Sequence, residues 1–240
     1  MTGTHLKTHR KCRPLPPTGM RLILLTAMLL LGAVSGVARA QESAAQDPEG
    51  AKAFITDLAD RAMAIWRDPT RTQLEREKGF RDLLFEGFDV DFLAKISLGR
   101  FARQMTREQY DEYMRLFPDY VVNKFANRIG EYSNQTIEIG EAVPAGTRDV
   151  FVRTTLVRPG AEPLAADWRV RKTKDGFRIV DVKVEGISMV ISQRDEFAAL
   201  IEKSGIEGLL EELRKGAAEL AAKDAALEAE RAARDKGASQ

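Results

Sequence analysis

Asp181 is the carboxylate whose position most suggests chemistry, because it interrupts the apolar, strand-like segment FRIVDVKVEG. A buried Asp can have a raised pKa, and in a cone-shaped α+β enzyme it could abstract a proton together with a tyrosine. The structural alternative is that Asp181 caps a bulge in the strand or pairs with a nearby arginine such as Arg169. The residues alone leave both roles open.

Histidine and cysteine are nearly absent, which removes most other catalytic and metal-binding chemistry. The chain has two histidines and one cysteine, and all three, His5, His9 and Cys12, lie near its start. The remaining sequence therefore cannot supply a disulfide, a Cys nucleophile, a Ser-His-Asp triad or a Cys/His zinc site. It also has no glycine-rich nucleotide loop and no clustered calcium-loop carboxylates. We expect no cofactor and no metal.

Residues 1–40 have the three parts of a secretory signal peptide. A basic head precedes the apolar run Leu22–Val34, and Ala38-Arg39-Ala40 offers small residues before a cut. A membrane anchor is the alternative, but the run is shorter than the ~20 residues that span a bilayer. We therefore expect a mature chain from Gln41, outside the cytoplasm. Because residues 1–40 carry only basic charges, cleavage turns the net charge of +1 negative, which disfavours nucleic-acid binding.

Helices are predicted in the first half of the mature chain. Asp47 can cap a helix that starts at Pro48, and apolar residues then recur every three or four positions. Two further helical stretches follow, over about 71–85 and within DVDFLAKISLGRF, and Gly99 should end the latter.

A fourth helix is predicted over TREQYDEYMRLFPDYVVNKFANRIGEY. Thr106 and Gln109 fit a capping box at its start, and Pro118 should kink or split it. Aromatic residues form one stripe along this segment. The stripe is either packed core or the wall of a site for an apolar ligand, and the sequence leaves both possibilities open.

After Tyr132 the apolar period changes from about 3.6 residues to 2, which predicts strands. The four segments are QTIEIGEAV, RDVFVRTTLVRP, LAADWRVRK and FRIVDVKVEG. The short loops between them, including KDG, make neighbouring strands antiparallel. In the fourth segment the apolar parity changes between Ile179 and Val182, so either a bulge lies near Asp181 or both faces are covered.

The order of elements predicts an α+β fold, with a curved four-stranded antiparallel sheet packed against N-terminal and C-terminal helices. Helix returns near Gln193, and from Ala217 onward the chain is rich in alanine and charge, which predicts a solvated helix or disorder. The expected organisation is a signal peptide (1–40), one domain (41–216) and a tail (217–240). Within the domain we expect a helical part (41–132), the sheet (133–191) and C-terminal helices (192–216).

The segment SLGRFARQMTREQYDEYMRLFPDYVVNKFANRIGEYSNQ resembles the L-G-R…T-x-x-Q…F…E-Y-S signature of the MlaC-like, or toluene-tolerance, periplasmic phospholipid carriers. The residues at its positions are Leu98-Gly99-Arg100, Thr106, Gln109, Phe117 and Glu131-Tyr132-Ser133. DWRVR, FRIVDVKVEGISMV, RDEF and SGIEGLL resemble the later parts of the family in the right order. The resemblance covers about Ala51 to Lys215.

This resemblance implies an NTF2-like domain that encloses an apolar pocket and has no enzymatic activity. It implies a periplasmic shuttle for phospholipid, which maintains the lipid asymmetry of the outer membrane. The implied partners are an outer-membrane lipoprotein complex and an inner-membrane ABC transporter complex with its MCE-type subunit. The residues expected to line the pocket are Tyr113, Phe117, Tyr120, Val121, Phe125, Val150, Val152, Trp168, Val170, Val182, Val184, Ile187 and Met189.

The chain departs from the family pattern at a few positions. Ala102 stands where an aromatic residue is common, Phe125 replaces the usual tyrosine, and Pro118 is unusual. Ser192-Gln193 replaces a frequent Asn-Tyr pair, and this form resembles members associated with hopanoid-producing bacteria. A hopanoid or another apolar lipid is therefore an alternative cargo.

Overall fold

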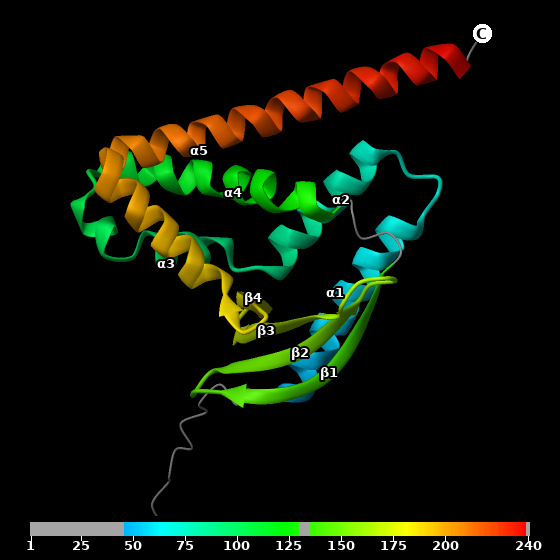
Figure 1. Ribbon diagram of the computed structural model, residues 1–240, viewed down its shortest axis with the longest axis horizontal. Coiled ribbons are helices and arrows are strands. Elements are labelled where there is room, and N and C mark those ends of the chain that lie inside the picture. Colours follow the sequence, from blue (N-terminus) through cyan, green and yellow to red (C-terminus); the bar gives the residue numbers. More distant parts are fainter. Residues whose placement is uncertain (1–45, 130–134, 239–240) are drawn as a thin grey trace, which may run out of the picture. The chain divides into compact units, whose positions relative to one another are not determined.

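The computed structural model describes residues 46–129 and 135–238, which lie within one unit, Ser43–Gln240 (Figure 1). The expected signal peptide and the Glu131-Tyr132-Ser133 motif lie outside these residues. Helices come first, a sheet follows, and a long helix ends the described chain. The elements are α1 Pro48–Arg67, α2 Gln73–Gly87, α3 Val90–Leu98, the 3-10 helix η1 Gly99–Gln104, α4 Arg107–Ile129, β1 Thr136–Ala145, β2 Asp149–Val157, β3 Leu164–Thr173, β4 Gly176–Val184, β5 Ile187–Ser188 and α5 Met189–Ala238.

The helix starts follow the local capping signals. The Asp47 side chain accepts a hydrogen bond from the Gly50 N–H before α1, with Pro48 in the first turn. Thr106 and Gln109 exchange the two hydrogen bonds of a capping box before α4. Gly99 follows α3 with φ 53°, a conformation that glycine adopts without strain. These predicted boundaries are confirmed.

The sheet is antiparallel throughout, with the strand order β1-β2-β3-β4-β5. Arg169 pairs with Asp181 and Val170 pairs with Ile179, so Val180 is the extra residue of a bulge. Of the two alternatives for this strand, the structure has the bulge near Asp181. The α+β class is confirmed.

The sheet has five strands rather than the expected four. Glu185 and Gly186 both have positive φ, 49° and 79°, which reverses the chain tightly after β4. Ile187 and Ser188 then pair with Val184 and Lys183 as the short strand β5. The extra strand arises because Glu185 and Gly186 form a complete turn after β4.

The buried apolar residues form two clusters. The sheet cluster joins α1 to one face of the sheet and contains Ala51, Ile55, Val150, Val152, Val170 and Ile179. The helical cluster joins α3, η1, α4 and α5, with Tyr113, Phe117, Phe197, Leu209, Leu210 and Leu213 among its members. Figure 1 shows α4 and α5 side by side, with α1 along the sheet.

Two helices run through residues that favour interruption. α4 extends from Arg107 to Ile129 with Pro118 inside it, so the proline does not split the segment into two helices. α5 contains a break at Gly205, whose φ of 72° and ψ of 178° are not helical. Beyond Ala217 the chain stays helical up to Ala238, with mostly exposed side chains.

Candidate functional site

One face of the sheet is almost entirely apolar and is called the apolar face below. The register of the strands places its side chains side by side across the sheet. Its members are Ile137, Ile139 and Ala142 of β1, Val150, Val152, Thr154 and Leu156 of β2, Leu164, Ala166, Trp168 and Val170 of β3, and Ile179, Val182 and Val184 of β4.

The apolar face has a closed end and an open end. At the closed end α1 covers Val152, which is 0% exposed, together with Val150 and Val170. At the open end Leu156, Ala166 and other apolar side chains are only half-buried. The closed end is folding core, whereas the open end keeps apolar surface available to a second molecule.

Thr154 is the polar side chain of the apolar face, and its hydroxyl group is fully used within the sheet. It donates a hydrogen bond to the Ala166 carbonyl oxygen at 3.1 Å and accepts one from Trp168 Nε1 at 2.9 Å. The Trp168 ring also meets the Phe88 ring edge-on, with centroids 6.3 Å apart. A ligand on this face therefore meets hydrocarbon and satisfied polar groups.

The opposite face of the sheet carries charge. Arg153 contacts Glu141 at 3.2 Å, and Asp149 accepts hydrogen bonds from Arg169 and Arg171, both at 2.7 Å. Burial alone would raise the pKa of Asp149, but the hydrogen bond from Arg171 and the charges of both arginines together lower it below its ordinary value. The sheet thus has a charged side and an apolar side.

Asp181 is buried and has a structural role. Its carboxylate accepts hydrogen bonds from the Ser188 hydroxyl at 2.6 Å and from the Val190 N–H at 3.2 Å, where α5 begins. The suggested pairing of Asp181 with Arg169 is wrong, because Arg169 binds Asp149 on the neighbouring strand. These contacts fit an anchor for the turn from the sheet into α5.

The aromatic stripe of α4 lies in the helical cluster. Tyr113 and Phe117 are packed against Phe197, with ring centroids 6.1 Å and 6.4 Å from it. The Tyr113 hydroxyl donates to the Ala94 carbonyl oxygen at 2.9 Å, and burial raises the pKa of Tyr113. Tyr120 and Val121 pack at the edge of the same cluster.

The structure therefore brings the predicted site residues together in two groups. Val150, Val152, Trp168, Val170 and Val182 belong to the sheet cluster or pack against it, whereas Tyr113, Phe117, Tyr120 and Val121 belong to the helical cluster or pack against it. Which of these side chains touches a ligand stays a prediction.

Four predicted residues lie outside both clusters. Val184 is half-buried on the open end of the apolar face, and Met189 is half-buried at the start of α5. Phe125 lies below Lys124, whose Nζ is 5.9 Å from its ring centroid. Ile187 is 60% exposed on β5, so it lies at the surface rather than against a buried wall.

Sequence reasoning named Val184 but missed the other residues of the open end. Leu156, Leu164 and Ala166 share the strand parity of Val152, Trp168 and Val170, so the signal was present in the alternation. Phe88 was missed because it follows α2 in the chain and reaches the sheet only through a bridge to Ile179.

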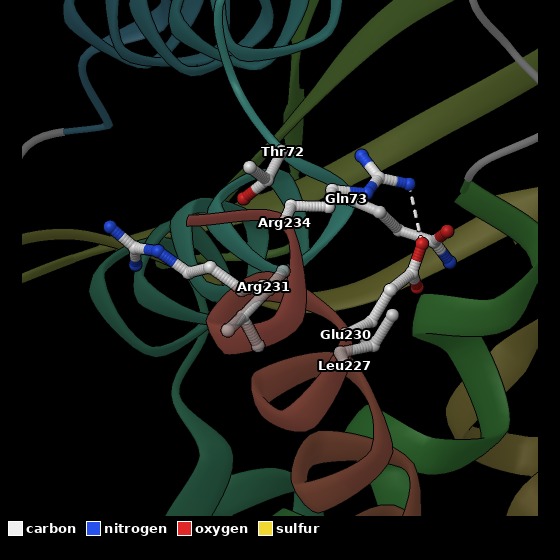
Figure 2. A pocket seen from close by; sticks show the side chains of 7 residues that line it. Thr72, Gln73, Leu227, Glu230, Arg231 and Arg234 are labelled. Atoms are coloured by element: carbon white, nitrogen blue, oxygen red, sulfur yellow. Dashed lines mark hydrogen bonds and ion pairs between the residues drawn. The ribbon is translucent and has the colours of Figure 1, made fainter. Parts of the chain in front are cut away.

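A small hollow lies between α2 and the last turns of α5 (Figure 2). Its volume is about 40 Å³, whereas sites for small molecules usually enclose about 300–1,000 Å³. It is lined by Thr72, Gln73, Leu74, Leu227, Glu230, Arg231 and Arg234. Within residues 46–129 and 135–238, no cluster of three or more metal-ligating His, Cys, Asp or Glu side chains is present.

Comparison with known proteins gives one consistent answer. The family model described as MlaC protein matches residues 56–215. The intermembrane phospholipid transport system binding protein MlaC of Haemophilus influenzae is 22% identical over 177 residues, which cover 71% of this chain and 80% of that protein. A phospholipid-binding protein from Ralstonia solanacearum, solved in complex with a phospholipid, has 28% identity and a TM-score of 0.62, and the match covers 71% of this chain and 98% of that one.

Proposed function

This chain belongs to the MlaC family, and on that premise we propose that it is a periplasmic lipid-transfer protein that carries phospholipid between complexes of the outer and inner membranes. The observation that carries the proposal is the open end of the apolar face, which holds half-buried Leu156, Leu164 and Ala166 beside a fully packed closed end. The relative from Ralstonia solanacearum binds a phospholipid, and the relative from Haemophilus influenzae belongs to a phospholipid transport system.

The energetics of a free lipid explain why such a carrier is needed. Two acyl tails of about 15 methylenes each, at ~0.8 kcal/mol per CH₂, cost about 24 kcal/mol to expose to water. A carrier removes this cost if its site is about as apolar as a bilayer. The direction of transfer is then left to the partner complexes.

The apolar face suits this task because it supplies branched and aromatic side chains and few polar atoms. The hydroxyl group of Thr154 is already paired within the sheet, so an acyl tail does not have to desolvate it. Trp168 and Phe88 add a rigid aromatic surface between the sheet and α2. No step of this task requires a general base or a metal, and we propose a function without catalysis.

The proposed location is the periplasm, with an outer-membrane lipoprotein complex as one partner. The other is an inner-membrane ABC transporter complex with its MCE-type subunit. In the described parts of the chain, every helix is too short or too polar to cross a bilayer. The proposed role at these complexes is to maintain the lipid asymmetry of the outer membrane.

The test is to purify the chain from residue 41 onward, extract it with organic solvent and identify the extracted lipid by mass spectrometry. Uptake of labelled phospholipid from vesicles is measured in parallel. We expect phospholipid in the extract and saturable uptake. A hopanoid in the extract would support the alternative cargo, and repeated absence of both lipid and uptake would refute a carrier function.

A further inference from the structure

The last part of α5 lies against α2 although it extends beyond the family match. The MlaC model ends at residue 215, whereas α5 continues to Ala238. Residues 216–238 are called the strap below. Three of its ion pairs with α2 run in antiparallel order, because Asp224, Glu228 and Arg231 meet Arg81, Lys78 and Glu75 in turn. The strap is therefore a specific packed element rather than a free extension.

Four ion pairs join the strap to α2, each between a basic and an acidic side chain. Their partners and N–O distances are Arg81–Asp224 at 2.9 Å, Glu77–Lys223 at 3.0 Å, Lys78–Glu228 at 2.9 Å and Arg231–Glu75 at 3.4 Å. The first pair is 23% exposed on each side, and Glu77 and Lys223 are 16% and 30% exposed. Partly buried pairs are screened less by salt than fully exposed ones, so these two pairs give the strap its register.

Apolar contacts also hold the strap. Leu220 is 5% exposed, in the part of the strap where Glu219 accepts a hydrogen bond from Asn123 of α4 and an added Cβ at Gly216 would lie 3.3 Å from the Tyr120 ring. Leu227 and the buried Leu74 of α2 both line the small hollow between the two helices. Exposed ion pairs alone contribute little, so this burial is the second and independent contact that holds the strap.

α2 is also the helix that reaches the apolar face. Directly after α2, Phe88 contacts the Trp168 ring, and the Asp89 N–H donates to the Ile179 carbonyl oxygen at 2.9 Å. Gly87 packs so closely on Leu58 of α1 that an added Cβ would lie 2.9 Å from Leu58 Cδ1. A movement of α2 would therefore change the cover of the apolar face.

We propose that the strap holds α2 in place and thereby slows the exchange of lipid at the apolar face. This inference rests on the proposed function, because the gated step is the entry and exit of an apolar ligand. Release of the strap frees α2 to move away from Trp168. Salt weakens the charged part of the contact and speeds exchange.

The test inverts the charges of the strap in the full chain from residue 41. The variant K223E/D224K/E228K opposes all three of its α2 partners, and adding E77K/K78E/R81E restores opposite signs at each pair. The control is R107D/D111R, which swaps an exposed ion pair within α4. Circular dichroism confirms folding. If the triple variant does not fold, K223E alone and E77K/K223E replace it.

Two readouts separate the strap from the carrier function. Hydrogen exchange of the α2 amides is measured on delipidated protein, and release of labelled phospholipid to acceptor vesicles reports the gate. We expect the strap variant to show both processes about 5–10-fold faster, the rescued variant to return to the original rates, and the control to stay unchanged.

If hydrogen exchange of the α2 amides is unchanged in the strap variant, the proposal that the strap holds α2 is refuted. If hydrogen exchange of the α2 amides is faster but lipid release is unchanged, the strap holds α2 but does not slow the exchange of lipid. If no form of the protein takes up lipid, the proposed function and the gate both fail, while the α2 amides still decide whether the strap holds α2.

Discussion

A tryptophan at Ala166 tests whether the open end of the apolar face binds lipid. Ala166 is half-buried, lies between Thr154 and Val184 in the strand register, and leaves room for a larger side chain. Val152 would be a poor position for the same test, because it is fully buried beneath α1 and a tryptophan there would overpack the core.

The size of the effect follows from contact area. A tryptophan side chain buries about 150–250 Å², and an indole that takes about 200 Å² of contact from an acyl tail costs the lipid about 5 kcal/mol at ~25 cal/mol per Å². Even half of that, about 2.5 kcal/mol, lowers the affinity by about 60-fold at 1.4 kcal/mol per tenfold.

The neighbouring Ala165 supplies a matched control, because it is exposed and its side chain points to the opposite face of β3. Ala166→Trp and Ala165→Trp are compared by lipid per protein after extraction and by uptake of labelled phospholipid. We expect loss of lipid only in Ala166→Trp, with the same circular dichroism in both variants. Equal lipid content in the two variants would refute the assignment of the open end.

Three further predictions concern the polar anchors. Asp149→Asn should destabilise the protein by about 3 kcal/mol at neutral pH, because a buried carboxylate leaves its two arginine partners. The folded pKa of Asp149 lies below its ordinary value of 3.8, so its contribution exists above that pH and is lost as pH falls through the folded pKa. Urea unfolding at pH 7 and pH 3 should show the gap between the two proteins narrowing, and a constant gap would contradict this. Tyr113→Phe should cost about 1–2 kcal/mol in thermal unfolding through the lost bond to Ala94 and leave lipid content unchanged. Asp181→Ala should cost about 1–3 kcal/mol with normal lipid content, whereas loss of a measurable turnover would revive the catalytic alternative.

Local signals were sufficient to predict much of the fold. Asp47 with Pro48, and Thr106 with Gln109, marked helix starts because capping depends on residues only three positions apart. The change of apolar parity near Asp181 left a bulge as one of two alternatives, and the structure has this bulge at Val180.

Long-range packing was harder to predict. The sequence predicts one apolar face on α4 around Tyr113 and another on the strands around Val152. The spacing of apolar residues does not show whether these two faces meet, and in the structure they belong to separate clusters. Ile187 continues an apolar run in the sequence, yet the turn before it places it on an edge strand at the surface. The strap was expected to be a solvated helix or disordered, because it has few leucines. The sequence alone does not show that its charges meet opposite charges on α2.

The free edge of β1 has a consequence for solubility. A protein that offers apolar surface to lipid also risks pairing edge to edge with its own copies. The register of β1 against β2 shifts between Ile139 and Ala142, and Pro144 removes an N–H that a foreign strand would need. Glu138 and Glu141 add like charges along the same strand. The strand that borders the apolar face is thereby a poor template for edge-to-edge pairing.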